Sequence, residues 1–299
     1  MGGDRIDHDM TELPNLAITG STGAVGGRVA QRLADAGIPQ RLLVRDASDA
    51  PELAGAYPVE TPDYGDFDAM RTALRGVQTL FLVSFREAED RLERHFHAVD
   101  AAVDAGVERV VYLSFLQASA DSTFKLGRQH HATEERIRDS GLRFTFLRSS
   151  FYADFVPFFT GDDGVIRAPA GDGKVSWITR DDIADTVVAA VQTGAHDGEA
   201  LENTGPAALD FHETAAILTR VTGREISYVP ESEEEAWASR RPTGAPRWEI
   251  EGWVSSYLAI ANGELAMVSD TVERLTGHPA IDLESFLSAH PELWSHLAG

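Results

Sequence analysis

Residues 16–27 read Leu-Ala-Ile-Thr-Gly-Ser-Thr-Gly-Ala-Val-Gly-Gly, and this stretch decides the fold. Residues 16–19 are a short apolar run, typical of a buried strand. A Cβ at Gly20 or Gly23 would obstruct the turn or the approach of a phosphate to backbone N–H groups, whereas Gly26 lets a helix pack on the strand. Glycines also make ordinary strand-to-helix turns, but a strand before the loop and a helix after it indicate a dinucleotide site.

Short apolar runs alternate with amphipathic helical patterns through the first half of the chain. The predicted strands are residues 16–19, 41–44, 79–83, 109–113 and 144–147, and residues 133–139 are predicted to form a helix before the last of these strands. Continuous apolar strands separated by helices are typical of a parallel sheet that is covered on both faces. We therefore expect a Rossmann-type, doubly wound α/β fold.

The pattern changes beyond about Asp154, and the cluster of glycine and proline in residues 161–173 predicts turns there. We expect three parts, in chain order. They are a flexible N-terminal tail (1–15), an NAD(P)-binding Rossmann domain (16–160), and mainly a smaller C-terminal α+β substrate lobe (161–299), with elements near 174–204 returning to the Rossmann sheet. Because ligands of such sheets bind at the carboxyl ends of the strands, this lobe would close over that crevice.

Composition excludes several classes of function. The 299 residues contain 26 Lys plus Arg against 48 Asp plus Glu, a net charge of −22, and such an acidic surface repels nucleic acid. The absence of cysteine removes disulfides, thiolate metal sites and Cys nucleophiles. No apolar run is long enough to cross a membrane, and the start lacks a signal-peptide pattern, so we expect a cytoplasmic protein. We expect no metal, because His95 and His97 lie two apart and point to different helix faces.

The end of the second predicted strand bears on the choice of cofactor. It holds Arg45 followed by Asp46. An arginine offers a planar cation for the 2′-phosphate of NADP, whereas an acidic residue would accept a hydrogen bond from the ribose 2′-hydroxyl of NAD. We expect NADP(H), with NAD as the alternative that Asp46 leaves open.

Several segments together resemble the NmrA-like group of atypical short-chain dehydrogenase/reductases. They are residues 19–27, 43–46, 100–107, 130–135, 140–148 and 177–184. The likeness runs from about residue 16 to 230. That group includes quinone oxidoreductases, triphenylmethane reductases and NADP-sensing regulators.

The resemblance implies a set of cofactor-binding residues. It places Gly20, Thr22, Gly23, Ala24, Val25 and Gly26 at the pyrophosphate, Arg45 at the adenosine phosphate, Asp63 and Tyr64 near adenine, and Ser84 and Ser114 at the nicotinamide ribose and ring. Short polar residues also end buried strands routinely, so each of these positions has a purely structural alternative.

The Tyr-x-x-x-Lys relay of ordinary short-chain reductases is missing. Asp121 and Ala170 stand four residues before the only lysines, Lys125 and Lys174, so a phenol activated by a neighbouring ammonium is not available. His130 occupies a position at which the quinone-reducing members also have histidine. Imidazole titrates near neutrality and can donate a proton, but this residue can equally be a polar residue near a helix start.

Aromatic residues are dense after the strand predicted at residues 144–147. We expect Phe85, Phe151, Tyr152 and Phe155 to contact a flat, conjugated substrate, although this cluster can equally be core between the two lobes. The candidate catalytic residues are His130, Ser114 and Tyr152. The family often has Tyr-x-Glu-Asn where this chain has Tyr152-Ala-Asp-Phe155, so the identity of the substrate does not transfer.

Together these features predict an NADPH-dependent oxidoreductase that passes hydride to a small, electron-poor conjugated or aromatic acceptor such as a quinone, enone or azo compound. Delocalisation in such acceptors takes up the charge without a strong general acid. The alternatives are a non-catalytic, NADP-binding redox sensor of the NmrA type and a biosynthetic reductase or epimerase. The sequence leaves the oligomeric state, the physiological substrate and the stereochemistry open.

Overall fold

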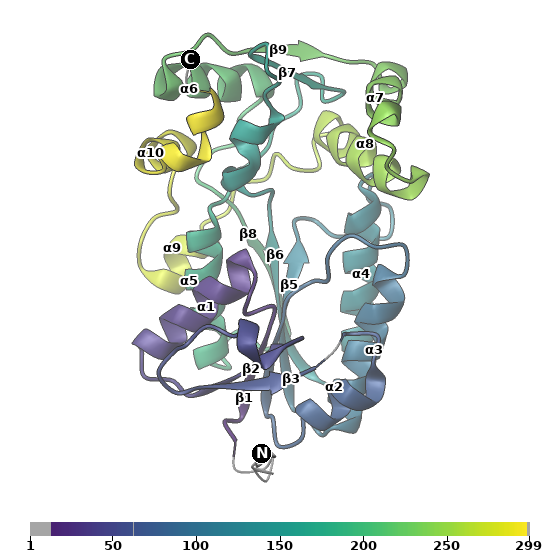
Figure 1. The fold of residues 1–299 in the computed structure, drawn as a ribbon, viewed down its shortest axis with the longest axis vertical. Coiled ribbons are helices and arrows are strands. Elements are labelled where there is room, and N and C mark those ends of the chain that lie inside the picture. Colours follow the sequence, from purple (N-terminus) through teal and green to yellow (C-terminus); the bar gives the residue numbers. More distant parts are fainter. Residues whose placement is uncertain (1–12, 62, 298–299) are drawn as a thin grey trace, which may run out of the picture.

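A parallel seven-stranded sheet forms the centre of the computed structural model, which describes residues 13–61 and 63–297 (Figure 1). Its strands are β1 (Leu16–Thr19), β2 (Gln40–Val44), β3 (Ala56–Glu60), β4 (Thr79–Leu82), β5 (Arg109–Phe115), β6 (Arg143–Ser149) and β8 (Glu199–Asn203). They follow the order β3-β2-β1-β4-β5-β6-β8, and each neighbouring pair is parallel. The prediction of a doubly wound fold is confirmed. Of the predicted tail, residues 1–12 lie outside the described residues.

Helices cover both faces of this sheet (Figure 1). The first group is α1 (Ala24–Asp35), α5 (Arg180–Gln192) and α9 (Thr271–Thr276), and the second is α2 (Phe67–Ala73), α3 (Arg91–Asp104) and α4 (Lys125–Asp139). Val29 of α1 and Val187 of α5 share one core with Ile18 of the sheet, while Val99 of α3 packs in a second core with Leu80. Apolar residues on both faces explain why the strands are continuously hydrophobic.

A smaller lobe lies above the carboxyl ends of the strands (Figure 1). It contains the parallel pair β7 (Val165–Ala168) and β9 (Ser227–Pro230), and the helices α6 (Phe211–Thr222), α7 (Glu233–Arg240), α8 (Arg247–Ala261) and α10 (Leu283–Ala289). Short 3-10 helices are η2 (Ala47–Asp49), η3 (Ala153–Phe159), η4 (Arg241–Thr243), η5 (Pro291–Leu293) and η6 (Ser295–Leu297). Trp177 anchors the core of this lobe, since its indole N–H donates to Thr214 at 3.2 Å and its ring lies 6.0 Å from that of Phe211.

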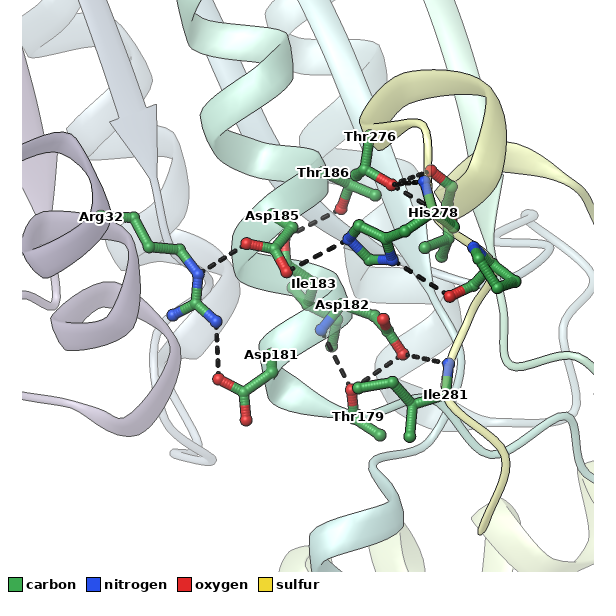
Figure 2. Close-up of polar contacts among 12 residues, drawn as sticks. Arg32, Thr179, Asp181, Asp182, Ile183, Asp185, Thr186, Thr276, His278 and Ile281 are labelled. Carbon is green, nitrogen blue, oxygen red and sulfur yellow. Dashed lines mark hydrogen bonds and ion pairs between the residues drawn. The ribbon is translucent and has the colours of Figure 1, made fainter. Parts of the chain in front are cut away.

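Polar contacts join helix α5 to α1 on one side and to the C-terminal segment on the other (Figure 2). Arg32 of α1 forms ion pairs with Asp181 at 2.7 Å and with Asp185 at 2.6 Å. On the other side of α5, one carboxylate oxygen of the buried Asp182 accepts hydrogen bonds from the Thr179 hydroxyl at 2.8 Å and from the Ile281 backbone N–H at 3.0 Å. These contacts hold the chain between α9 and α10 against α5.

The structure differs from the predicted elements mainly at α4, which starts at Lys125, whereas only residues 133–139 show a helical pattern in the sequence. Its buried face carries Gly127, His130 and Glu134, whose small or polar side chains give no apolar periodicity. Strand β7 lies within the stretch 161–173 that was expected to be turn-rich. Within the described part of the chain, no helix combines the length and hydrophobicity needed to span a bilayer.

Candidate functional site

A cavity of about 630 Å³ opens at the carboxyl ends of the strands, where loops after β1, β2, β4, β5 and β6 meet. It is lined by every residue that the sequence placed at the site. These are Gly20, Thr22, Gly23, Ala24, Val25, Gly26, Arg45, Asp63, Tyr64, Ser84, Phe85, Ser114, His130, Phe151, Tyr152 and Phe155. The structure thus brings them together, while their individual roles stay predictions.

The glycine turn leaves the N-terminus of α1 open toward this cavity. Gly20 has a φ of +64°, which favours glycine, and its carbonyl accepts from the Gly23 N–H at 2.9 Å. No side chain caps α1, because its N-cap is Gly23. A Cβ on Gly26 would lie only 2.2 Å from the Gly20 oxygen, so the close approach of turn and helix requires glycine there. The uncapped N–H groups and the helix dipole suit an anion such as a pyrophosphate.

The end of β2 presents Arg45 to the cavity as an exposed side chain, without an ion pair to any described residue. Asp46 is engaged locally, because its carboxylate accepts from the Ser48 N–H at 2.8 Å and from the Ser48 hydroxyl at 2.6 Å. These hydrogen bonds lower the pKa of Asp46. Arg45 is therefore the free charged group at this strand end.

Asp63 and Tyr64, which follow β3 beside β2, are both held in place by other residues. Asp63 forms an ion pair with Arg94 of α3 and accepts from the Gly65 N–H at 2.8 Å. The Tyr64 hydroxyl donates to the Val83 carbonyl at 2.9 Å, and its ring lies 5.3 Å from the Phe85 ring. Tyr64 thus offers a ring surface to a ligand rather than a free hydroxyl.

Ser114 donates its hydroxyl proton to the buried carboxylate of Glu134 at 2.6 Å. Glu134 also accepts from Arg148 Nε at 2.8 Å, and Arg148 reaches Glu202 at 3.1 Å. With its proton committed to Glu134, the Ser114 oxygen faces the cavity as an acceptor. Sequence reasoning missed Glu134 and Arg148 as supports, although both lie in the segments that carry the family resemblance.

Both ring nitrogens of His130 are occupied. Arg91 Nη2 lies 3.0 Å from Nε2, and the Tyr112 hydroxyl lies 2.9 Å from Nδ1. A guanidinium only donates, so Nε2 must be the acceptor and the proton of the neutral ring sits on Nδ1. Burial, with Arg91 and His95 nearby, holds the pKa of His130 well below its usual value. In this arrangement His130 has no proton to give to a ligand in the cavity.

An aromatic wall lines another part of the cavity. The rings of Phe124 and Phe151 lie 4.9 and 5.1 Å from that of Phe115. Tyr152 stacks with Phe155 at 6.1 Å, and its hydroxyl bonds to no described residue. Burial raises the pKa of Tyr152 to about 12. Phe124 was missed because it precedes a helix that the sequence pattern did not reveal, and Phe115 because the predicted strand 109–113 ends two residues before it.

The remaining aromatics of this segment, Phe158 and Phe159, do not line the cavity. The ring of Phe159 packs 5.8 Å from Trp177 in the core of the smaller lobe, and Phe158 is 61% exposed. The segment after β6 therefore contributes both to the cavity and to the core between the lobes.

The charge of the cavity is opposite to that of the whole protein. Its lining includes Arg45, Arg86, Arg91 and Arg180, against the acidic residues Asp63 and Glu87. In a chain of net charge −22, such a lining indicates an anionic ligand. No group of three or more acidic or histidine side chains within residues 13–61 and 63–297 is arranged to hold a metal ion.

The doubly wound sheet, the uncapped glycine turn and the basic cavity at the strand ends define a dinucleotide-binding α/β protein. The sequence model of the NmrA-like family matches residues 14–239, and the chain belongs to this family. The predicted family relationship is therefore confirmed.

Named relatives cover almost the whole chain. NAD(P)H azoreductase of Xenophilus azovorans is 33% identical, covering 92% of this chain and 97% of the relative. The (4-alkanoyl-5-oxo-2,5-dihydrofuran-3-yl)methyl phosphate reductase of Streptomyces griseus is 34% identical, covering 94% and 99%. Among solved structures, NADPH-dependent quinone oxidoreductase of Escherichia coli in complex with NADPH has a TM-score of 0.84 at 31% identity, covering 92% of this chain and 99% of that one.

Proposed function

We propose that the chain is an NADPH-dependent oxidoreductase that transfers hydride to small, electron-poor conjugated acceptors of the quinone, azo or enone type. The observation that carries this proposal is the continuity of one cavity from the glycine turn to the aromatic wall. A dinucleotide bound at the turn and a flat acceptor against the wall would share a single enclosed space. The relatives at 33% and 34% identity are named as reductases, which supports the same class of reaction.

The residues at the strand ends fit NADPH. The N–H groups of Ala24, Val25 and Gly26 would bind the pyrophosphate, and Arg45 would bind the 2′-phosphate. Asp63 and Tyr64 would border adenine. Bound NADPH would supply a hydride equivalent, the chemistry that the side chains around the cavity lack.

Ser84 and Ser114 would border the nicotinamide ribose and ring. Because Ser114 accepts toward the cavity, it suits a donor such as a ribose hydroxyl or a carboxamide N–H better than a carbonyl oxygen. It would therefore orient the cofactor rather than protonate the substrate.

The acceptor would lie against Phe85, Phe151, Tyr152 and Phe155. The Tyr152 hydroxyl faces no described hydrogen-bond partner, and its high pKa keeps it protonated at neutral pH. It can therefore donate a hydrogen bond to an acceptor oxygen, while conjugated acceptors take their final proton from water. Small-molecule substrates and a cytoplasmic location stay predictions.

A non-catalytic redox sensor is the principal alternative. A sensor needs the glycine turn and Arg45, but it has no use for an aromatic wall continuous with the cofactor cavity. The test compares equilibrium binding of NADPH and NADP⁺ with NADPH consumption in the presence of quinones, azo dyes and enones. Tight binding with consumption of NADPH supports the enzyme, and tight binding without consumption on any acceptor supports the sensor.

A further inference from the structure

Arg91, at the start of α3, is a buried cation without a carboxylate partner. Its side chain lines the cavity, the residue is only 2% exposed, and it forms no ion pair with any residue that the structure describes. Glu87 acts on it electrostatically, but at more than ion-pair distance. Burial lowers the pKa of Arg91, yet an arginine stays protonated in proteins. An unpaired buried charge lowers the stability of the folded protein.

Neutral acceptors fix the position of the guanidinium. Nε donates to the Phe85 carbonyl at 2.8 Å, Nη1 to Gln129 Oε1 at 3.1 Å and Nη2 to His130 Nε2 at 3.0 Å. These bonds use three of the five N–H groups of an arginine and cancel none of its charge. Two N–H groups therefore remain without a partner among the described residues.

The hydrogen-bond partners of Arg91 are themselves fixed by further hydrogen bonds. His130 is oriented by Tyr112 at 2.9 Å, and the Phe85 backbone N–H donates to Nε2 of the buried His95 at 2.8 Å. His95 in turn contacts Thr133 at 2.9 Å. A buried, hydrogen-bonded and uncompensated cation at the wall of a cavity is what a site needs in order to stabilise a developing negative charge.

We propose that Arg91 binds the oxygen anion that forms on the acceptor during hydride transfer, and so favours acceptors whose reduction places charge on oxygen. This inference rests on the proposed function. For a quinone, the C4–H bond of the dihydronicotinamide breaks with its electron pair, NADPH is oxidised to NADP⁺, and the quinone is reduced to a hydroquinone monoanion. A proton from water then gives the hydroquinone. His130 is a positioning residue that holds Arg91.

The charge of the acceptor distinguishes an arginine that binds an oxygen anion from one that only supports the fold. A quinone becomes an anion on receiving hydride, whereas a cationic triarylmethyl dye becomes neutral. Removing an oxyanion donor typically lowers kcat by about 10²–10³-fold. We expect Arg91→Met to lower the ratio of kcat/KM for the quinone to kcat/KM for the dye by about 100-fold, and Arg91→Lys to lower it less.

Arg136→Met is the matched control, because Arg136 lies on α4, pairs with Asp100 at 2.6 Å and does not line the cavity. It should leave the ratio within threefold of wild type. NADPH affinity and the melting temperature, measured for each variant, show whether the variant is folded. A ratio that stays within threefold in folded Arg91→Met overturns the proposal.

A second measurement requires no turnover, and its first arm uses wild-type protein alone. The probe is 4-nitrophenol, a flat aromatic whose phenolate is coloured, titrated with wild-type protein saturated with NADP⁺. Stabilisation of an oxygen anion lowers the pKa of the bound phenol by at least one unit, about tenfold in phenolate affinity over phenol affinity. Absence of a saturable shift in wild type overturns the proposal, as does a shift that folded Arg91→Met retains.

The two proposals fail in different ways. If wild-type protein consumes no NADPH with any acceptor, the proposed function is wrong, and the phenol titration alone decides whether the cavity binds an oxygen anion at Arg91. If wild type reduces quinones but the phenol shift is absent, the function stands and the role of Arg91 is wrong.

Discussion

The carboxylate of Asp46 is bound by the residue two positions ahead of it, since Ser48 donates both its N–H at 2.8 Å and its hydroxyl at 2.6 Å. In this local turn Asp46 begins η2 and does not extend toward the cavity. We therefore predict that Arg45, rather than Asp46, contacts the adenosine ribose, and that it selects the 2′-phosphate of NADPH.

Arg45→Ala should weaken NADPH binding by roughly 1.5–3 kcal/mol, the range of a hydrogen bond to a charged group, and leave NADH binding nearly unchanged. The loss comes from the 2′-phosphate, which NADH does not have. Isothermal titration with both cofactors measures it. Equal losses for NADPH and NADH would show that Arg45 serves the fold instead.

Gly23→Val should abolish cofactor binding while the protein stays folded. A Cβ at Gly23 meets the Gly20 oxygen at 3.2 Å, which is tight but tolerable, and the φ of −93° suits any residue. The added methyl groups would occupy the space of the pyrophosphate.

Gly27→Val is the matched control for this change. A Cβ there meets a similar backbone oxygen, that of Ser21, at 3.1 Å, but Gly27 does not line the cavity. It should retain NADPH binding. Circular dichroism checks folding in both variants, and binding that survives in Gly23→Val would remove the main support for the dinucleotide site.

His130→Ala should lower kcat on a quinone by less than about tenfold, or under about 1.4 kcal/mol of barrier. The neutral ring accepts from Arg91 and holds no proton for the acceptor, and Arg91 keeps its bonds to Phe85 and Gln129. His131→Ala, next to it and outside the cavity lining, is the control. A loss of several hundredfold with unchanged NADPH affinity would make His130 the essential acid.

Asp182 should make stability depend on pH. Burial raises its pKa, and its second oxygen, Oδ1, has no hydrogen-bond partner among the described residues (Figure 2). The pKa of Asp182 in the folded protein lies above its unfolded value of about 3.9. The stabilisation by protonated Asp182 is therefore complete below about pH 3.9, and it is lost as pH rises through the folded pKa.

Two variants separate the charge of Asp182 from its hydrogen bonds. Asp182→Asn keeps an acceptor for Thr179 and Ile281 without the charge, so its free energy of unfolding should rise relative to wild type as pH increases from about 4 to about 7. Asp182→Ala loses both bonds and should cost about 1–3 kcal/mol at neutral pH. Urea unfolding measures both, and an identical pH dependence in wild type and Asp182→Asn would contradict this account.

The parts of the fold that sequence predicted correctly are those that local patterns encode. The apolar run before Gly20 and the spacing of Val25, Val29 and Leu33 specify β1 and α1 without reference to the rest of the chain. The first turns of α4 could not be predicted in this way. Their buried residues are satisfied by distant partners, as when His130 contacts Tyr112 of β5.

The same distinction separates the site residues that were located from the sequence from those that were not. Arg45 was located because it ends a predicted strand, and parallel strands bring their carboxyl ends to one edge. Ser114 was located through the resemblance to the NmrA-like group. Arg91 was not, because it stands in the run Glu-Asp-Arg-Leu-Glu-Arg, which is indistinguishable from a solvated helix face. Only the three-dimensional fold shows that its guanidinium is buried between Phe85 and His130.

The central claim is that hydride passes from NADPH to a conjugated acceptor within one cavity, and isotope transfer tests it most directly. NADPH carrying deuterium at the transferring C4 position is incubated with the protein and an enone, whose β-carbon retains the label after reduction. We predict one deuterium in the reduced product for each NADPH consumed. Tight binding of NADPH with no deuterium in the product, and no consumption above the protein-free rate with enones, quinones or azo dyes, would contradict the account.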